Sequence, residues 1–464
     1  MIPLASLISP GDLRGAAILS AVFLSLIVLA ELWRRFGNPE AEWTRKFVHL
    51  GGGMVCLTFP FLVQSPVVIL AMAVPLTVLF VAGSRFGFLK SLHGVKRRSR
   101  GAELYPLSVF LVFLMTQGRP WLYLSALLVL AVADAFAALI GSRYGVVRYE
   151  VEDEYKSLEG SLVFLVLAFL AVHLPTLLLT DLPRPVCVLA ALLVAILVTG
   201  FEAISLQGAD NLFVPLAVVV ILGKITTKPL PEVIFQNLSL LAFCLAVALV
   251  VWRARSLNVG GAITFVLFAY GTWSLGSWQW AIPVALGFAG YVTAWSTFAP
   301  RGHALGVKVR TVARALLPPF TMLLLANSFR DNPKYFGPYL AASGAVFAFS
   351  LDTGVFRLEK RPGRRWILGA LGLGLLAGIF VAFVPWRIQR IPAEPFLVLL
   401  GVVMAVSLAN AAIELRDREA QRSREWTAWR FLLSYAAAGA ILAAQAFGGL
   451  APWDPSWMPS WWIG

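Results

Sequence analysis

Long runs of apolar residues recur along the whole chain, separated by short polar segments. Each run has roughly 17 to 20 residues, about the length at which a helix crosses the hydrocarbon core of a bilayer. The pattern therefore predicts an all-α polytopic membrane protein with about sixteen transmembrane helices. The predicted spans are residues 15–32, 47–64, 66–84, 103–117, 121–140, 160–180, 185–205, 210–223, 232–251, 258–275, 279–298, 312–328, 338–356, 366–385, 395–414 and 431–449.

The composition excludes a soluble globular domain. The 464 residues are 59% hydrophobic and 13% charged, and the mean hydropathy is +0.80. The first apolar run is followed by another apolar run, so we interpret it as a retained helix and not as a signal peptide. The net charge of +14 arises in short loops and not on one basic surface. We therefore expect the lipid bilayer as a partner, and no nucleic acid.

The basic residues also predict an orientation. When the loops are assigned alternately to the two sides of the membrane, most of the 38 Lys and Arg residues fall on one side. Lys and Arg are enriched in the cytoplasmic loops of membrane proteins. We therefore expect the N-terminus to lie outside and the basic loops to lie in the cytoplasm.

A short motif occurs twice in the chain. The segment 95–106, V-K-R-R-S-R-G-A-E-L-Y-P, returns at 307–318 as V-K-V-R-T-V-A-R-A-L-L-P, with five of twelve positions identical. Glu202 pairs with Glu414 at the same offset of 212 residues. These matches predict two parallel repeats of about eight spans each.

The two predicted repeats differ in their polar residues. Asp134 has a counterpart in Asp352 after a small insertion, but the cluster K-S-L-E-G-S at 156–161 has none. After Asp352 the chain passes through basic residues into another apolar run. We therefore predict a catalytic membrane domain at 1–230 and a related, non-catalytic repeat at 231–464.

An aspartate lies within the fifth predicted span. Asp134 is about 9 Å inside the cytoplasmic end of that span at the usual helical rise, a depth at which an ionisable group is costly and typically functional. On a helix, Ala138, Gly141 and Gly145 share its face, so a neighbouring helix or a ligand could approach the backbone there. The alternative interpretation is a carboxylate satisfied by a neighbouring Arg or Ser.

The start of the sixth predicted span has the composition of an anion site. Ser157, Gly160 and Ser161 offer hydroxyls and backbone amides at a helix N-terminus, and Lys156 supplies the positive charge that a polyphosphate needs. The same segment, including Glu159, could instead form a capping box. Both interpretations stay open on the sequence alone.

Further polar residues map to the cytoplasmic ends of other spans. They are Arg45, Lys46 and His49 in the second span, Glu202 in the seventh, and Asp210 and Asn211 in the eighth. The cations could contact a phosphate or a lipid headgroup. Asp210 and Asn211 offer the hard oxygen atoms that Mg²⁺ accepts, although a helix N-cap is the alternative for Asp210. The convergence of both charge signs on one membrane face favours a functional site.

The order of these motifs resembles the phytol kinase and dolichol kinase family of membrane-bound, CTP-dependent prenol kinases. The resemblance rests on R-K-F-V-H, D-A-x-A-x-L-I-G-x-x-x-G, K-S-x-E-G-S, F-E-A and D-N-L-x-x-P, and it covers roughly residues 20–228. The C-terminal half, from R-S-L-N-V-G-G-A to L-D-T, is similar to a related family that includes plant phytyl-phosphate kinase. It departs from that pattern after Asp352.

The resemblance implies transfer of a phosphoryl group from CTP to the hydroxyl of phytol, geranylgeraniol, dolichol or another isoprenoid alcohol at the cytoplasmic face. Such a reaction depends mainly on positioning, metal and positive charge. We expect Mg²⁺ or another divalent cation at Asp134, Asp210 and Asn211. The predicted catalytic residues are Asp134, Lys156, Glu159 and Glu202. The predicted nucleotide-binding residues are Arg45, Lys46, His49, Gly141, Gly145, Lys156, Ser157, Gly160 and Ser161.

Two other functions fit parts of the sequence. A phosphatidate cytidylyltransferase uses the same nucleotide to make a CDP-lipid, but the Lys-Asp pair and the His-Gly-Gly followed by Asp-Arg of that family do not occur here. A lipid transporter or flippase would agree with many spans and parallel repeats. It would also require matched functional residues in both halves, and the cluster at 156–161 has no match.

Overall fold

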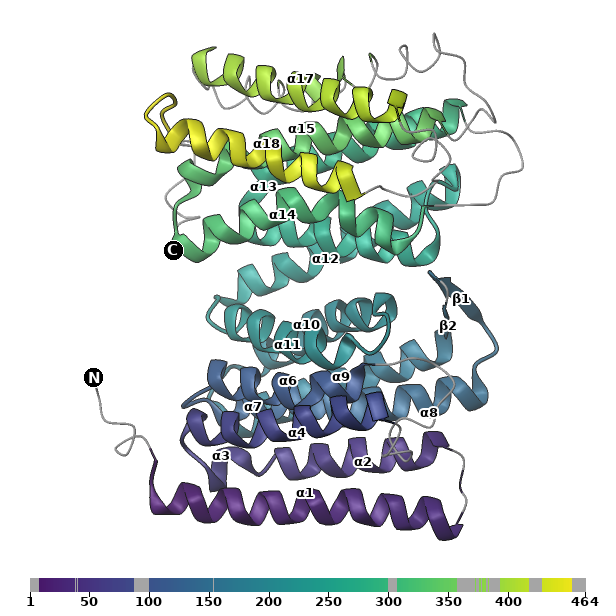
Figure 1. The fold of residues 1–464 in the computed structure, drawn as a ribbon, viewed down its shortest axis with the longest axis vertical. Helices are drawn as coiled ribbons and strands as arrows, with labels where there is room; N and C mark the ends of the chain where they lie inside the picture. The colour runs from purple at the N-terminus through teal and green to yellow at the C-terminus, as the bar shows by residue number, and fades with distance from the viewer. Residues whose placement is uncertain are drawn as a thin grey trace. The chain divides into compact units, whose positions relative to one another are not determined.

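The computed structural model describes residues 8–37, 39, 41–86, 100–152, 154–298, 307–356, 393–416 and 428–452, with a few positions between 372 and 383. The chain is built mainly from helices, as the hydrophobic pattern predicts (Figure 1). It divides into two compact units, Met1–Leu240 and Leu241–Gly464.

The first unit consists mainly of helices. Its elements are α1 (Pro10–Gly37), α2 (Ala41–Cys56), α3 (Phe59–Leu62), α4 (Pro66–Phe86), α6 (Gly101–Met115), α7 (Pro120–Leu128), η2 (Val129–Ala133), α8 (Asp134–Tyr144), β1 (Arg148–Val151), β2 (Glu154–Ser157), α9 (Leu158–Leu179), α10 (Arg184–Ile204) and α11 (Asp210–Ile225). Consecutive helices pack on each other, as α8 does on α9 and α9 on α10, and α6 also packs on α11. The last contact joins the middle of this unit to its end.

Between α8 and α9 the chain forms a short β-hairpin, which the hydrophobic pattern did not predict. Strands β1 and β2 pair antiparallel, with Arg148 opposite Ser157 and Tyr149 opposite Lys156. Glu152, at the turn, has a φ of 55°. The hairpin lies beyond the ends of α8 and α9 (Figure 1) and delivers Lys156 and Ser157 directly to the start of α9.

The helix lengths support a multi-pass membrane protein. Among the described residues, eight helices are long and apolar enough to cross a bilayer. They cover Pro10–Gly37, Pro66–Phe86, Pro120–Tyr144, Leu158–Leu179, Arg184–Ile204, Leu230–Ala254, Val259–Thr293 and Val309–Phe329. The count of sixteen spans in two parallel repeats stays a prediction.

One predicted span is divided in the structure, and the predicted break between two others coincides with an interruption in a long helix. The span 47–64 is divided between α2 and α3, with Pro60 in the first turn of α3. The spans 258–275 and 279–298 correspond to α13 (Val259–Phe298), which is interrupted at Ser277 by a φ of 72°. The span 366–385, the basic residues 357–365 and residues 95–99 of the repeated motif lie outside the continuously described parts of the chain.

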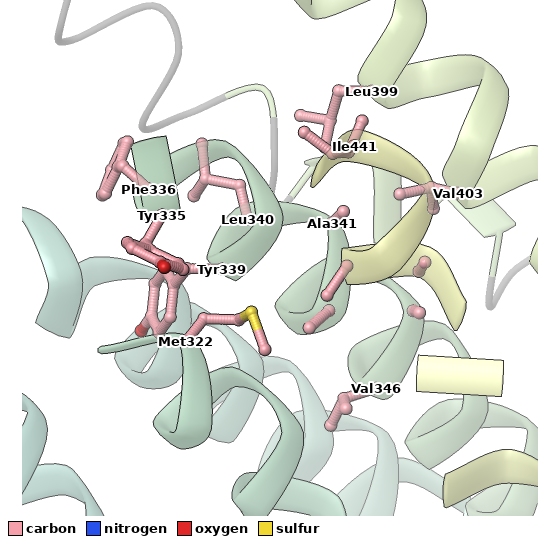
Figure 2. Close-up of a cluster of buried hydrophobic side chains, with 14 of the residues drawn as sticks. Met322, Tyr335, Phe336, Tyr339, Leu340, Ala341, Val346, Leu399, Val403 and Ile441 are labelled. Carbon is pink, nitrogen blue, oxygen red and sulfur yellow. The ribbon is translucent and has the colours of Figure 1, made fainter. Parts of the chain in front are cut away.

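Helix α15 forms the centre of the second unit. The elements here are the end of α12 (Leu230–Ala254), then α13, α14 (Val309–Phe329), α15 (Asn332–Phe356), α17 (Ala393–Arg416) and α18 (Ala428–Ala446). Figure 2 shows Phe336 and Tyr339 of α15 among other buried apolar side chains. The Tyr339 ring lies 4.7 Å from that of Trp280. The side chain of Asp352 lies outside the described residues, so its pairing with Asp134 stays a prediction.

Candidate active site

A π-helical turn precedes Asp134 and fixes its position. In η2, the backbone N–H of Asp134 donates to the carbonyl of Val129, whereas in an α-helix it would donate to the carbonyl of Leu130. The Leu130 carbonyl instead accepts from the imidazole of His49, whose Nε2 lies 2.9 Å away. Because a carbonyl oxygen only accepts, His49 Nε2 carries a hydrogen. The side chain of His49 therefore satisfies a backbone group that the π-turn leaves open.

The carboxylate of Asp134 is paired within the helix bundle. Its Oδ2 lies 2.9 Å from Lys46 Nζ and 3.3 Å from His49 Nε2. The side chains of Lys46 and Asp134 are 7% and 18% exposed, so water screens this pair poorly. The nearest partners of the carboxylate are thus a lysine and a histidine, and Arg45 also lies within electrostatic range. The pair joins α2 to α8.

A second ion pair joins the hairpin to α10. Lys156 Nζ lies 2.7 Å from Glu202 Oε1, and it also donates to the Glu202 carbonyl. Burial alone would lower the pKa of the Lys156 amine, but the Glu202 and Asp210 carboxylates together, with the hydrogen bond to Glu202, outweigh this effect and raise the pKa above its ordinary value. The amine is therefore charged at neutral pH.

The predicted anion site at the start of α9 is also a helix cap. Ser157 is the N-cap residue, and its Oγ accepts from the backbone N–H of Gly160 at 3.2 Å. Ser161 is 2.7 Å from the hydroxyl of Tyr149 on β1. Both hydroxyls thus have partners in the protein, while Ser157 and Ser161 still line the cavity described below. Capping and phosphate binding draw on the same amides.

Close packing of α8 on α9 accounts for the predicted glycines. A Cβ at Gly141 would lie 2.8 Å from Ser157 Oγ and 3.2 Å from the Cα of Gly160. A Cβ at Gly145 would lie 2.6 Å from the Cβ of Ser157. The small-residue face of α8 therefore receives the N-terminus of α9. Gly141 and Gly160 also line the cavity, whereas Gly145 is not among its lining residues.

Glu159 faces away from the other candidate catalytic residues. Its Oε1 accepts from the backbone N–H of Val147 at 3.0 Å, so it ties the start of α9 to the hairpin. Glu159 does not line the cavity, whereas Glu202 does. Of the two glutamates predicted to be catalytic, the geometry favours Glu202.

Asp210 and Asn211 begin α11 beside the other charged groups. The side-chain amide of Asn211 donates to the carbonyl of Gly101 at 2.8 Å and thus ties α11 to α6. Asp210 lies within electrostatic range of Asp134, Lys156 and Glu202. Because the Asn211 amide nitrogen is a donor, the side-chain oxygen is the atom of Asn211 that could bind a cation.

These oxygen atoms fit a metal that brings other ligands with it. Among the residues that the structure describes, no three His, Cys, Asp or Glu side chains converge as a complete metal site. Mg²⁺ typically takes one or two carboxylates and completes its shell with water and substrate phosphates. The carboxylates of Asp134 and Asp210 agree with that pattern, and Mg²⁺ bound there would neutralise phosphate charge.

One cavity of about 790 Å³ contains both the charged groups and a long apolar lining. Its polar part includes Arg45, Lys46, His49, Asp134, Lys156, Ser157, Ser161, Glu202, Asp210 and Asn211. Its apolar part is lined from α1, α2, α4 and α6 by Phe23, Leu24, Ile27, Cys56, Ile69, Met72, Leu76, Leu79, Phe80 and Val109, among others. The polar residues come from the starts of α2, α9 and α11, the end of α10, α8 and the hairpin.

The cavity lining also includes large polar side chains that were not predicted as site residues. Arg148 and Tyr155 of the hairpin line the cavity, and so does Tyr105 of α6, whose ring contacts that of His49 at 5.2 Å. Tyr105 belongs to the repeated motif, where the second copy has Leu317. That tyrosine-to-leucine difference was a signal available in the sequence.

The fold and the cavity together define a class. Buried, paired charges that share a cavity with an apolar lining are typical of a polytopic membrane protein with a site for an amphipathic ligand. The chain is 37% identical over 201 residues to the phytol kinase of Synechocystis sp., and the alignment covers 43% of this chain and 86% of that protein. The chain therefore belongs to the phytol kinase family, which makes it a lipid kinase. No family model and no solved structure matches it.

Proposed function

We propose that the protein phosphorylates an isoprenoid alcohol with a nucleoside triphosphate. The observation that supports this proposal is the single cavity in which Lys46, Asp134, Lys156 and Glu202 adjoin an apolar lining. An isoprenoid alcohol has one polar end and a long apolar chain, so it matches both parts of the cavity at once. The similarity to a phytol kinase supports the same substrate class.

The charged residues suggest how the transfer proceeds. The alcohol oxygen attacks the γ-phosphorus, and the bond from that phosphorus to the oxygen bridging the β-phosphate breaks. Lys46, Lys156 and Arg45 would neutralise the phosphates, which is the main electrostatic requirement of this reaction. A phosphate that pairs with Lys156 would release Glu202, which then orients the hydroxyl and takes its proton.

The nucleotide and the metal belong to the same proposal. We propose CTP as the phosphoryl donor, because the motifs resemble CTP-dependent prenol kinases, and Mg²⁺ at Asp134 and Asp210. The basic loops support a site on the cytoplasmic face, with the N-terminus outside. We also propose sixteen spans in two parallel repeats, of which the first is catalytic and the second is not.

The test uses the purified full-length protein in lipid vesicles with a panel of isoprenoid alcohols and the four nucleoside triphosphates. CTP labelled in the γ-phosphate should place label on the alcohol, and CTP labelled in the α-phosphate should not. Label transfer from the α-phosphate would instead indicate a cytidylyltransferase. Absence of transfer to every alcohol from every nucleotide would overturn the proposal.

Two substitutions sharpen the test. Glu202→Gln should lower turnover by a factor on the order of 10² or more, because it removes the proton acceptor. Glu232→Gln is the matched control, since Glu232 pairs with Lys228 on the surface at 3.1 Å and should retain turnover. Glu159→Gln distinguishes the two predicted glutamates: a loss as large as that of Glu202→Gln would contradict the assignment to Glu202.

A further inference from the structure

His49 was predicted from the sequence as a nucleotide contact, but its hydrogen bonds point elsewhere. Its Nε2 donates to the Leu130 carbonyl at 2.9 Å and also lies 3.3 Å from Asp134 Oδ2. The N–H of His49 thus bonds to the π-turn, and the ring nitrogen lies close to the carboxylate that follows this turn. A group held in this way by the protein has a defined orientation before any substrate binds.

The surroundings of His49 are fitted to the same turn. Gly53, one turn after His49 on α2, faces η2 so closely that a Cβ there would lie 2.2 Å from the Cβ of Ala131. The ring of Tyr105 meets the His49 ring edge to face, with centroids 5.2 Å apart. Helices α2 and α6 therefore hold the imidazole against η2 from two sides.

The π-turn determines the direction of Asp134. One extra residue in a helical turn rotates everything that follows by about 100° relative to a regular α-helix. Without η2, the Asp134 side chain would leave the face on which Lys46 and the cavity lie. The π-turn leaves the Leu130 carbonyl without its usual α-helical donor. An unpaired carbonyl is unfavourable inside a membrane protein unless another donor bonds to it. His49 is that donor.

We propose that His49 is a positioning residue of the phosphoryl-transfer site, which holds the π-turn through the Leu130 carbonyl and thereby directs the Asp134 carboxylate into the cavity. This inference rests on the proposed function, because it assigns His49 to the phosphoryl-transfer step. It replaces the predicted nucleotide contact with a role in the backbone. It also explains why R-K-F-V-H combines a cation for the carboxylate with a donor for the turn that carries it.

The test compares His49→Leu, which has no donor, with His49→Gln, which keeps a side-chain N–H. Tyr123→Phe is the matched control, because it removes another buried bond to a backbone carbonyl, from Tyr123 Oη to Cys56 at 2.9 Å. Full-length variants are purified, their thermal unfolding is measured, and kcat and both KM values are determined for the folded fraction.

We expect His49→Leu to lower kcat by a factor on the order of 10², as small misplacements of catalytic groups do, with little change in the nucleotide KM. His49→Gln should recover a substantial part of kcat, and Tyr123→Phe should keep kcat while lowering the unfolding temperature. Two results would overturn the inference. A raised nucleotide KM at unchanged kcat would show that His49 contacts the nucleotide, as predicted from the sequence. A His49→Leu variant that, like Tyr123→Phe, keeps kcat and only unfolds at a lower temperature would show that the His49 hydrogen bond serves stability alone. Inactive wild-type protein would refute the proposed function itself.

Discussion

Lys46 Nζ lies 2.9 Å from Asp134 Oδ2, although 88 residues separate the two in the chain. This ion pair joins the start of α2 to the start of α8. Both side chains also line the cavity, so the same pair contributes to the fold and to the candidate site. Experiments that substitute either residue must therefore separate an effect on stability from an effect on activity.

The first prediction concerns that separation. Asp134→Asn leaves the buried Lys46 amine without its counter-charge, and removing one partner of a buried pair costs about 3–5 kcal/mol. The double substitution Lys46→Met with Asp134→Leu removes both charges, so we expect much of the stability to return. Activity should be lost in both variants. Unfolding in detergent and turnover measure the two effects, and an active double variant would exclude this pair from catalysis.

The second prediction concerns Lys156 and pH. Its raised pKa means that the stabilisation from the charged amine is fully present below the ordinary lysine value and is lost only as the pH rises through the higher folded value. Deprotonation of Lys156 therefore does not limit activity between about pH 7 and 10. Lys156→Arg should leave any alkaline decline of kcat/KM at the same pH. A decline that moves to higher pH in that variant would assign it to Lys156.

The charge of Lys156 is tested separately. Lys156→Met removes the cation that would meet the phosphates, so the nucleotide KM should rise more than the alcohol KM. An equal rise in both constants would indicate a general loss of structure and not of phosphate binding. Thermal unfolding of the same samples provides the necessary comparison, because Glu202 is left unpaired in this variant.

The third prediction concerns the contact between α8 and α9. Gly141→Ala places a methyl group against Ser157 and Gly160, so it should destabilise the protein by about 1–3 kcal/mol. Gly223→Ala in α11 is the matched control, because the nearest atom to its added Cβ would lie 3.6 Å away. The control should be neutral or slightly stabilising, since alanine is the better helix former. Equal unfolding temperatures for the two variants would show that α8 and α9 can separate at no cost.

The fourth prediction concerns the apolar lining. Leu76 of α4 lines the cavity, whereas Leu70 of the same helix is exposed and does not. Leu76→Trp should shorten the space for the alcohol, so kcat/KM should fall more for long isoprenoid alcohols than for short ones. Leu70→Trp should leave that ratio unchanged. A uniform decrease for all chain lengths in Leu76→Trp would place the isoprenoid chain elsewhere.

The sequence predicted which charged residues belong to the candidate site, but it did not predict which of them contact each other. Arg45, Lys46, Asp134, Lys156, Glu202 and Asp210 stand out because ionisable groups are costly in apolar runs, and the structure brings all of them to one cavity. Periodicity could not pair Lys46 with Asp134, because that contact depends on how distant helices pack.

Local geometry was the other missing part. The π-turn η2 consists of V-L-A-V-A, which has no feature that distinguishes it from an ordinary α-helical turn. The hairpin has only four residues in each strand, with a mixed polar pattern. Gly141 was correctly placed on a small-residue face, but small residues serve helix packing and ligand approach equally well. Only the structure identifies α9 as the neighbour.

The charge of the cavity lining has a consequence for the form in which a nucleotide enters. Arg45, Lys46, Arg148 and Lys156 contribute four positive charges, and Asp134, Glu202 and Asp210 contribute three negative ones. A lining with so small a net positive charge attracts free phosphate or an uncomplexed nucleoside triphosphate only weakly, because the negative charge of the anion is much larger than the positive charge of the lining. We therefore expect free anions to compete weakly with a metal–nucleotide complex, so that the lining discriminates by total ligand charge as well as by shape.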